Sequence, residues 1–230
     1  MKFRFLSCLI FLFPVMLSGQ NVVDYKLFMD AAQEHSILFR GAFPLRFGHP
    51  VSHDGSTFFA YATNYQAGTL VFCKKPYKDV WLNLNAFTDD LYIMDPATGI
   101  PVLMNKDFVD SFTMGPHKFV CYKPDADSPL KEGYYETLYS GRILLFKKIQ
   151  KLLREENNNG NRILRRYLLS ETFYLQKNNT WYRINSKTDV IKLFPEQKKL
   201  IDHIAKTKAL DFRRNKHKAF MEICTYIDSL

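Results

Sequence analysis

Two histidines near the N-terminus have a spacing that zinc proteins use. His49 and His53 form an H-x-x-x-H pattern, and Asp54 follows the second histidine directly. On a helix this spacing places both imidazoles on one face, where they can bind the metal together. The surrounding segment GHPVSHDGS (48–56) is rich in glycine and proline, which predicts a loop. We therefore expect loop structure here and no metal site.

Paired carboxylates are the second candidate for chemistry. Asp89 and Asp90 are adjacent, and neighbouring residues of an extended segment point to opposite faces, so we interpret them as polar residues at a strand end. Asp125 and Asp127 resemble the beginning of a calcium loop. The glycine and the distant glutamate of such a loop are missing, so calcium is not expected.

Cysteine is the third residue type that can carry chemistry. Cys8 belongs to the N-terminal apolar run, which leaves Cys73, Cys121 and Cys224 in the remaining chain. An odd number cannot form a complete disulfide framework, although any two of them can pair in an oxidising compartment. Each also lies among apolar residues, a setting typical of buried free thiols. The pattern favours buried thiols and leaves a single disulfide open.

Recognised catalytic motifs are absent from the sequence. It contains no G-x-S-x-G, no Walker A, no dinucleotide-binding glycine pattern and no Cys-x-x-Cys. The sequon Asn178-Asn179-Thr180 falls within a predicted hairpin turn and carries little weight. We therefore predict no catalytic, cofactor-binding or metal-binding residues. The alternative is a hydrolase whose site is assembled from dispersed residues.

The first 20 residues have the pattern of a secretory signal peptide. Lys2 and Arg4 precede an apolar run (5–17), and Ser18 and Gly19 follow it. The run is shorter than the ~20 residues that span a bilayer. We predict cleavage of residues 1–20 and an exported protein that is periplasmic, associated with the outer envelope, or secreted.

The rest of the sequence predicts an α+β fold, with an antiparallel β-meander sheet or partial barrel followed by C-terminal helices. From about residue 57, strand patterns recur every 8–12 residues with turn residues between them. The segment KKPYKD (74–79) is predicted to be a turn, because Pro76 cannot lie inside a central strand. The expected organisation is a β-rich domain over 21–185 and a helical segment over 186–230 packed on it.

Turn and cap residues place several elements more closely. Asn178-Asn179 predicts a type I′ hairpin turn, since Asn tolerates the left-handed conformation. Ser186 or Thr188 is expected to cap a first helix, Pro195 to begin a second, and Asn215 to cap a third.

A basic stretch, GRILLFKKIQKLLREENNNGNRILRR (141–166), raises the question of an anionic partner. Residues 142–230 hold 20 Lys and Arg against 9 Asp and Glu, a formal charge of +11, whereas residues 1–141 carry −2. We expect a strand from Arg142 to about Lys148, which turns helical or stays extended, and then a mobile tip over 155–161.

The cations of this stretch are expected to form a solvated surface. Lys147, Lys148 and Lys151 are predicted to face solvent. The residues expected to face the core are the leucines and isoleucine Leu145, Ile149, Leu164 and Leu168. Contact with an anionic envelope surface is the main alternative. Nucleic acid is not expected, because an exported protein meets little of it and the nearby aromatics fit a sheet core.

Several motifs together resemble a family of secreted bacterial envelope proteins. Asp90-Leu91, Val109-Asp110-Ser111-Phe112 and the run from Tyr134 to Gly141 match its turns and core aromatics, while Asn85-Ala86 stands where the family has a Tyr-Asp pair. The resemblance covers roughly residues 65–228 and implies export and a β-rich fold, with no mechanism. We therefore expect a non-catalytic envelope-associated binding or accessory module, whose partner is an envelope protein or the anionic envelope surface.

Overall fold

The computed structural model describes residues 38, 41, 53–59, 65–124, 128–158 and 162–229. The predicted signal peptide, His49, Asp125 and Asp127 lie outside the described residues. Within the described ranges, no helix is both long enough and apolar enough to cross a bilayer.

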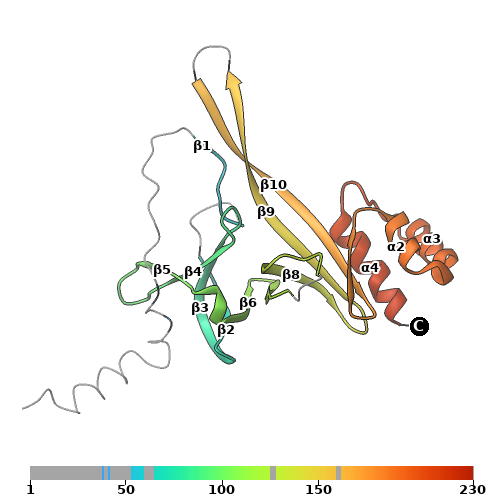
Figure 1. The fold of residues 1–230 in the computed structure, drawn as a ribbon, viewed down its shortest axis with the longest axis horizontal. Coiled ribbons are helices and arrows are strands. Elements are labelled where there is room, and N and C mark those ends of the chain that lie inside the picture. The colour runs from blue at the N-terminus through green and yellow to red at the C-terminus, as the bar shows by residue number, and fades with distance from the viewer. Residues whose placement is uncertain are drawn as a thin grey trace, which may run out of the picture. The chain divides into compact units, whose positions relative to one another are not determined.

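Eleven strands form one open sheet, which is antiparallel except where β1 joins it (Figure 1). The strands are β1 (His53–Asp54), β2 (Gln66–Phe72), β3 (Lys75–Asn85), β4 (Asp90–Met94), β5 (Pro101–Leu103), β6 (Val109–Met114), β7 (His117–Tyr122), β8 (Gly133–Ser140), β9 (Leu144–Asn158), β10 (Arg162–Lys177) and β11 (Thr180–Ile184). Their order is β1-β10-β9-β8-β7-β6-β2-β3-β4-β5, and β11 also pairs with β10. The helices follow the sheet in the chain, so the predicted α+β class is confirmed.

Alternation of apolar side chains defines the buried face of the first half of the sheet. The alternation in VWLNLNAF (80–87) predicts a half-buried strand with Val80, Leu82 and Leu84 on its buried face. These three are buried and Trp81 is half exposed, but Asn83 on the opposite face is buried as well. The three apolar residues belong to an apolar cluster that extends over β2 to β7 and includes Phe112 of β6. A separate cluster lies between β8 to β11 and the helices, and a third, smaller cluster is rich in aromatic residues.

The turn predicted at residues 74–79 is wrong. Pro76 lies inside β3, and the turn consists of Cys73 and Lys74 alone, both at positive φ. Because β4 pairs only with the far half of β3, the second edge of β3 carries no described strand beside Pro76. Proline is tolerated at such an edge, since it removes no ladder hydrogen bond.

The long β9–β10 hairpin also differs from the prediction. β9 continues as a strand to Asn158, without the helical turn that was one alternative, and Glu155 to Asn158 belong to it. In Figure 1 these two strands run far beyond β8 and α4 as a two-stranded arm. At the other end of β10, Asn178 and Asn179 both have positive φ, at 50° and 61°, which confirms the predicted turn.

Three helices and two short 3₁₀ turns complete the described fold. They are η2 (Lys106–Phe108), α2 (Lys187–Leu193), η3 (Pro195–Gln197), α3 (Lys198–Thr207) and α4 (Lys216–Asp228). Ser186 and Asp189 form a capping box at α2, and Asn215 caps α4, as predicted. Pro195 begins the 3₁₀ turn that leads into α3. Phe220 of α4 is fully buried in the cluster shared with the sheet.

The lysines of the basic stretch are buried, which corrects the expected solvated surface. Lys147, Lys148 and Lys151 have only 5%, 7% and 3% of their surface exposed. The two neighbouring lysines point to opposite faces of strand β9. The side chain of Lys147 contacts α4 on one face, and that of Lys148 contacts the turn before β4 on the other.

The apolar residues of the same stretch divide between core and surface. Leu145 and Ile149 are buried as predicted, but Leu168 is 40% exposed. Leu168 pairs with Leu152 on β9 and lies outside the part of β10, residues 173–177, that pairs with β11, so β11 does not cover it. The side chain of Leu164 lies outside the described part of the chain.

Candidate functional site

An ion pair between β9 and the turn before β4 forms the centre of the candidate site. Lys148 Nζ lies 2.6 Å from Asp89 Oδ1 and 3.0 Å from the carbonyl oxygen of Tyr134, and it stands 4.8 Å from the centre of the Tyr135 ring. The ammonium group therefore has two hydrogen-bond acceptors and lies beside an aromatic ring. Burial lowers the pKa of Lys148, while Asp89 acts in the opposite direction and favours the charged form.

Asp89 is held by further donors. Its Oδ2 accepts from Lys106 Nζ at 3.1 Å and from the backbone N–H of Tyr134 at 3.3 Å. Gly133 passes so close that a Cβ there would lie 2.2 Å from Asp89 Oδ2 and 2.6 Å from Lys148 Nζ. Gly133 also has φ of 145°, so both space and backbone conformation require glycine at this position.

A cavity of about 540 Å³ opens beside this ion pair. Its floor is the face of β9 and β10, and its walls come from the turn before β4 and the segment before β8. The lining residues are Phe87, Thr88, Asp89, Pro129, Lys131, Glu132, Tyr135, Lys148, Gln150, Ser170, Thr172, Tyr174 and Arg183. Most of them carry a hydroxyl, amide or charged group.

Many of these polar groups are not used by the fold. Within the described residues, the side chains of seven of them have no hydrogen-bond or ion-pair partner: Thr88, Lys131, Glu132, Gln150, Ser170, Thr172 and Arg183. Asp89 and Lys148 satisfy one another, and the Tyr135 hydroxyl donates to the carbonyl of Lys131 at 2.9 Å. Burial also raises the pKa of Tyr135, so its hydroxyl stays protonated. The cavity thus presents a rigid charged wall and a set of free hydrogen-bonding groups.

The described residues of the cavity lining carry a net positive charge. They include Lys131, Lys148 and Arg183 against Asp89 and Glu132, a formal +1. Lys106 contacts Asp89 from outside the lining and adds a second positive charge. An acidic group would therefore be favoured over a neutral or cationic one.

A second buried charged cluster lies on the opposite face of β9. Glu136 accepts from His117 Nδ1 at 2.6 Å, and its other oxygen forms an ion pair with Lys147 Nζ at 2.7 Å. Lys147 Nζ also lies 3.3 Å from His217 Nδ1 on α4 and 3.4 Å from Glu171. Burial and the Lys147 charge lower the pKa of His217. We interpret this cluster as a clamp between α4 and the sheet.

The comparisons with known proteins give no family. No family model matches the chain, and neither a curated protein nor a solved structure matches it significantly. The resemblance to secreted envelope proteins therefore stays a prediction, and the site must be interpreted from its own geometry.

The sequence-based candidates have different outcomes. Among the described residues, no group of His, Cys, Asp and Glu is arranged to hold a metal ion. His53 and Asp54 form strand β1 beside β10, where a loop was expected. Asp89 is far more than a polar strand end, because it pairs with Lys148 and Lys106. The sequence signal for this role was weak, since 59 residues separate the partners of its closest ion pair.

The three cysteines are free thiols in the structure. Cys224 is buried and Cys121 is partly buried, but Cys73 is exposed, which corrects the expectation that all three are buried. Cys73 lies in the two-residue β2–β3 turn, outside the strands that bury their apolar side chains, and has positive φ. Burial raises the pKa of Cys121 to about 11 and that of Cys224 to about 12.

Proposed function

We propose that the protein is an exported, envelope-associated binding module without catalytic activity, and that it binds a polar acidic ligand in the cavity on β9 and β10. The observation that carries this proposal is the set of hydrogen-bonding side chains in the lining that have no partner among the described residues. Polar groups that converge on a concave site and are unused by the fold are typical of ligand recognition. Hydroxyl, amide, ammonium and guanidinium groups together match the chemistry of an acidic saccharide.

Binding is favoured over hydrolysis by the state of the reactive groups in the lining. Lys148 is engaged by Asp89 and by the carbonyl of Tyr134, and its charged ammonium group has no lone pair with which to act as a nucleophile or base. Asp89 is neutralised by two ammonium groups, and the described lining residues place no second free carboxylate beside Glu132. A hydrolase would need one of these groups to be available to a substrate.

Titration calorimetry with trigalacturonate, an acidic oligosaccharide, tests the proposal. We expect saturable binding of one molecule, weak or absent binding of neutral maltotriose, and recovery of the trigalacturonate unchanged by chromatography. Arg183→Met should weaken binding by roughly tenfold or more, since a charge-assisted hydrogen bond contributes about 1.5–3 kcal/mol. Lys78→Met, an exposed lysine on β3 outside the lining, is the matched control and should bind normally.

Two results would count against the proposal. Equal binding by the Arg183→Met variant would place the ligand elsewhere on the protein. Shortened oligosaccharide products that form with the parent and not with Glu132→Gln would favour the hydrolase instead.

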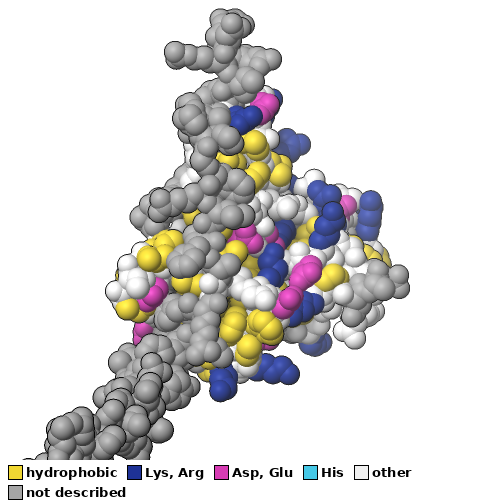
Figure 2. All heavy atoms as spheres, turned by 60° about the vertical axis from the view of Figure 1, so that its left-hand side comes forward, with side chains coloured by type: hydrophobic (Ala, Val, Ile, Leu, Met, Phe, Trp, Pro, Cys, Tyr) yellow, Lys and Arg dark blue, Asp and Glu magenta, His cyan; other side chains and the backbone are white. Residues whose placement is uncertain are grey.

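A second candidate, contact with an anionic envelope surface, is favoured by the arm. Four leucines of the arm are 40–53% exposed, which is unusual for residues of this type: Leu152, Leu153, Leu168 and Leu169. Arg154 is also exposed beside them. On the face seen in Figure 2, however, Lys and Arg side chains are spread over several places with Asp and Glu between them, without a single basic patch.

Sedimentation with phosphatidylglycerol vesicles distinguishes this second candidate. Binding that requires the leucines would be lost in a Leu152→Ser, Leu168→Ser variant and kept in a Lys78→Met variant. If the parent does not sediment with the vesicles at roughly physiological salt, where the Debye length is about 8 Å, the second candidate fails.

A further inference from the structure

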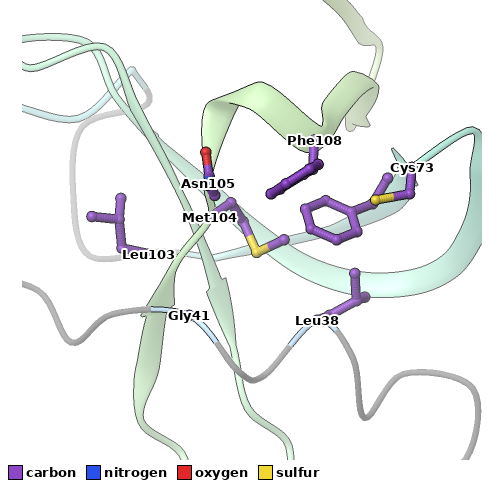
Figure 3. Close-up of a pocket in the computed structure, with 8 residues that line it drawn as sticks. Leu38, Gly41, Cys73, Leu103, Met104, Asn105 and Phe108 are labelled. Carbon is purple, nitrogen blue, oxygen red and sulfur yellow. The ribbon is translucent and has the colours of Figure 1, made fainter.

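A separate hollow of about 360 Å³ lies between the β2–β3 turn, the segment from β5 to η2, and the short described pieces at Leu38 and Gly41. Figure 3 shows Leu38, Met104 and Phe108 around it, with Cys73 at one side. Phe72 completes the lining and meets Phe108 edge to face, with ring centres 5.9 Å apart.

The described lining of this hollow is almost wholly apolar. Its polar side chains are those of Asn105, whose oxygen accepts from the N–H of Asp107, and of Cys73. Among the described lining residues there is no Lys, Arg, Asp or Glu. These residues therefore offer no partner to a charged ligand group, which would have to remain at the mouth.

The walls of the hollow are fixed before any ligand binds. The N–H of Cys73 donates to the carbonyl of Phe108 at 2.8 Å, and the N–H of Lys74 donates to Asp110 at 2.7 Å. At Gly41 a Cβ would lie 2.2 Å from the carbonyl oxygen of Leu103, so the chain passes here in close backbone contact. Preformed apolar cavities of this kind bind ligands without a large ordering cost.

We propose that this hollow is a binding site for an unbranched acyl chain. The volume is at the lower end of the range for small-ligand sites, about 300–1,000 Å³, which suits one short chain. The two phenylalanine rings meet at 64° and not in parallel, so they offer no flat slot for a planar ring. The lining also contains Met104 and two leucines, whose flexible side chains can adapt to a flexible acyl chain. Phe108 is 51% exposed, and a bound chain would cover part of that surface.

Cys73 provides a reporter for occupancy, because it is exposed at this hollow while Cys121 and Cys224 are shielded. The experiment measures alkylation of Cys73 by iodoacetamide in the full chain, with decanoate as the probe and acetate as its control. A ligand bound in the hollow slows alkylation of Cys73 by a factor of 1 + [L]/Kd, where [L] is the concentration of free ligand. Decanoate at ten times its Kd should therefore slow alkylation by about tenfold. Acetate should leave the rate unchanged.

Two variants locate the effect. Phe108→Ala removes one half-exposed wall residue and should raise the decanoate Kd by about tenfold, which corresponds to about 1.4 kcal/mol of lost apolar contact. Trp81→Ala removes a similarly exposed aromatic residue of β3 outside the hollow and should leave protection unchanged. Calorimetry on Cys73→Ser should give the same decanoate Kd as the labelling experiment.

A parallel experiment with phosphatidylglycerol vesicles distinguishes the two possible sources of the acyl chain. Protection by vesicles as well as decanoate identifies a bilayer lipid, and protection by decanoate alone identifies a free fatty acid. The proposal is overturned if decanoate does not protect Cys73 or if acetate protects it equally. It is also overturned if Phe108→Ala is protected as well as the parent, or if Cys73 reacts as slowly as Cys224 before any ligand is added.

Discussion

Replacing Asp89 by asparagine should destabilise the protein strongly, because it leaves Lys148 buried without its closest negative charge. Lys148 would keep only neutral partners, the Tyr134 carbonyl, the asparagine amide oxygen and the Tyr135 ring, with 7% of its surface exposed. Removing one partner of a buried ion pair costs about 3–5 kcal/mol, and we expect about 3 kcal/mol because Asp89 is partly exposed.

The protonation of lysine sets an upper limit to this cost and gives the prediction a pH dependence. A lysine can release its proton instead of remaining charged in a buried site, and from an ordinary pKa of about 10.4 this costs about 4.6 kcal/mol at pH 7 and about 1.9 kcal/mol at pH 9. With the pKa of Lys148 lower in the folded than in the unfolded state, the unfolded state binds more protons, so stability rises with pH. The Asp89→Asn variant should therefore recover stability relative to the parent between pH 7 and pH 9.

Urea unfolding at both pH values is the assay, with two comparison variants. Lys148→Met leaves Asp89 paired with Lys106 and should cost clearly less than Asp89→Asn, since an apolar group of similar volume replaces a buried charge. The double variant should be close to Lys148→Met alone. Glu155→Gln removes an exposed pair with Arg165 and should cost less than about 1 kcal/mol. If Asp89→Asn costs no more than Glu155→Gln, or shows no recovery at pH 9, the Asp89–Lys148 ion pair does not stabilise the fold in the way that we describe.

Three further predictions concern thiols, histidine and glycine. Cys73 should react rapidly with a thiol reagent at pH 8, because its side chain is exposed. Cys224, with a pKa of about 12, has a thiolate fraction of only about 10⁻⁴ at this pH, and Cys121 should also react slowly. Equal reaction rates of the three thiols, measured by peptide mass spectrometry, would contradict this. Because the pKa of His217 is lowered in the folded protein, stability should be lost as pH falls below about 6.5, the ordinary pKa of histidine. The His217→Gln variant should lose less thermal stability than the parent over this pH range. If the two proteins show the same pH profile in thermal melts, the contact between His217 and Lys147 is not as described. Gly133→Ala should destabilise by at least about 1–3 kcal/mol because it combines a strained φ with a clash; a variant as stable as the parent in urea would refute the close approach.

The part of the fold that follows from local pattern was predictable from the sequence. Alternation placed Val80, Leu82 and Leu84 on the buried face of one strand, and Asn178-Asn179 indicated a hairpin turn. Cap residues such as Ser186 and Asn215 located helix starts. These signals act over a few residues, so they need no knowledge of the tertiary structure.

The candidate site was not predictable, because its contacts join distant parts of the chain. From local sequence alone, a lysine among apolar residues is predicted to be a solvated cation. Lys148 is buried because it pairs with Asp89, which lies 59 residues away in the sequence. Lys147 likewise pairs with Glu136 across the sheet and lies 3.3 Å from His217, 70 residues away. The apolar neighbours of Cys73 suggested burial, but a two-residue turn with positive φ exposes it. Pairing across the sheet, and not local composition, decides burial at these positions.

The central claim, that the cavity on β9 and β10 binds an acidic polar ligand, is tested most directly by methyl NMR during a trigalacturonate titration. Thr88 and Thr172 line the cavity, whereas Thr98 lies in an exposed turn outside it and serves as the control. The account predicts saturable shifts of the Thr88 and Thr172 methyl signals with one common Kd, and no shift at Thr98. Unchanged Thr88 and Thr172 signals at saturating trigalacturonate would contradict it.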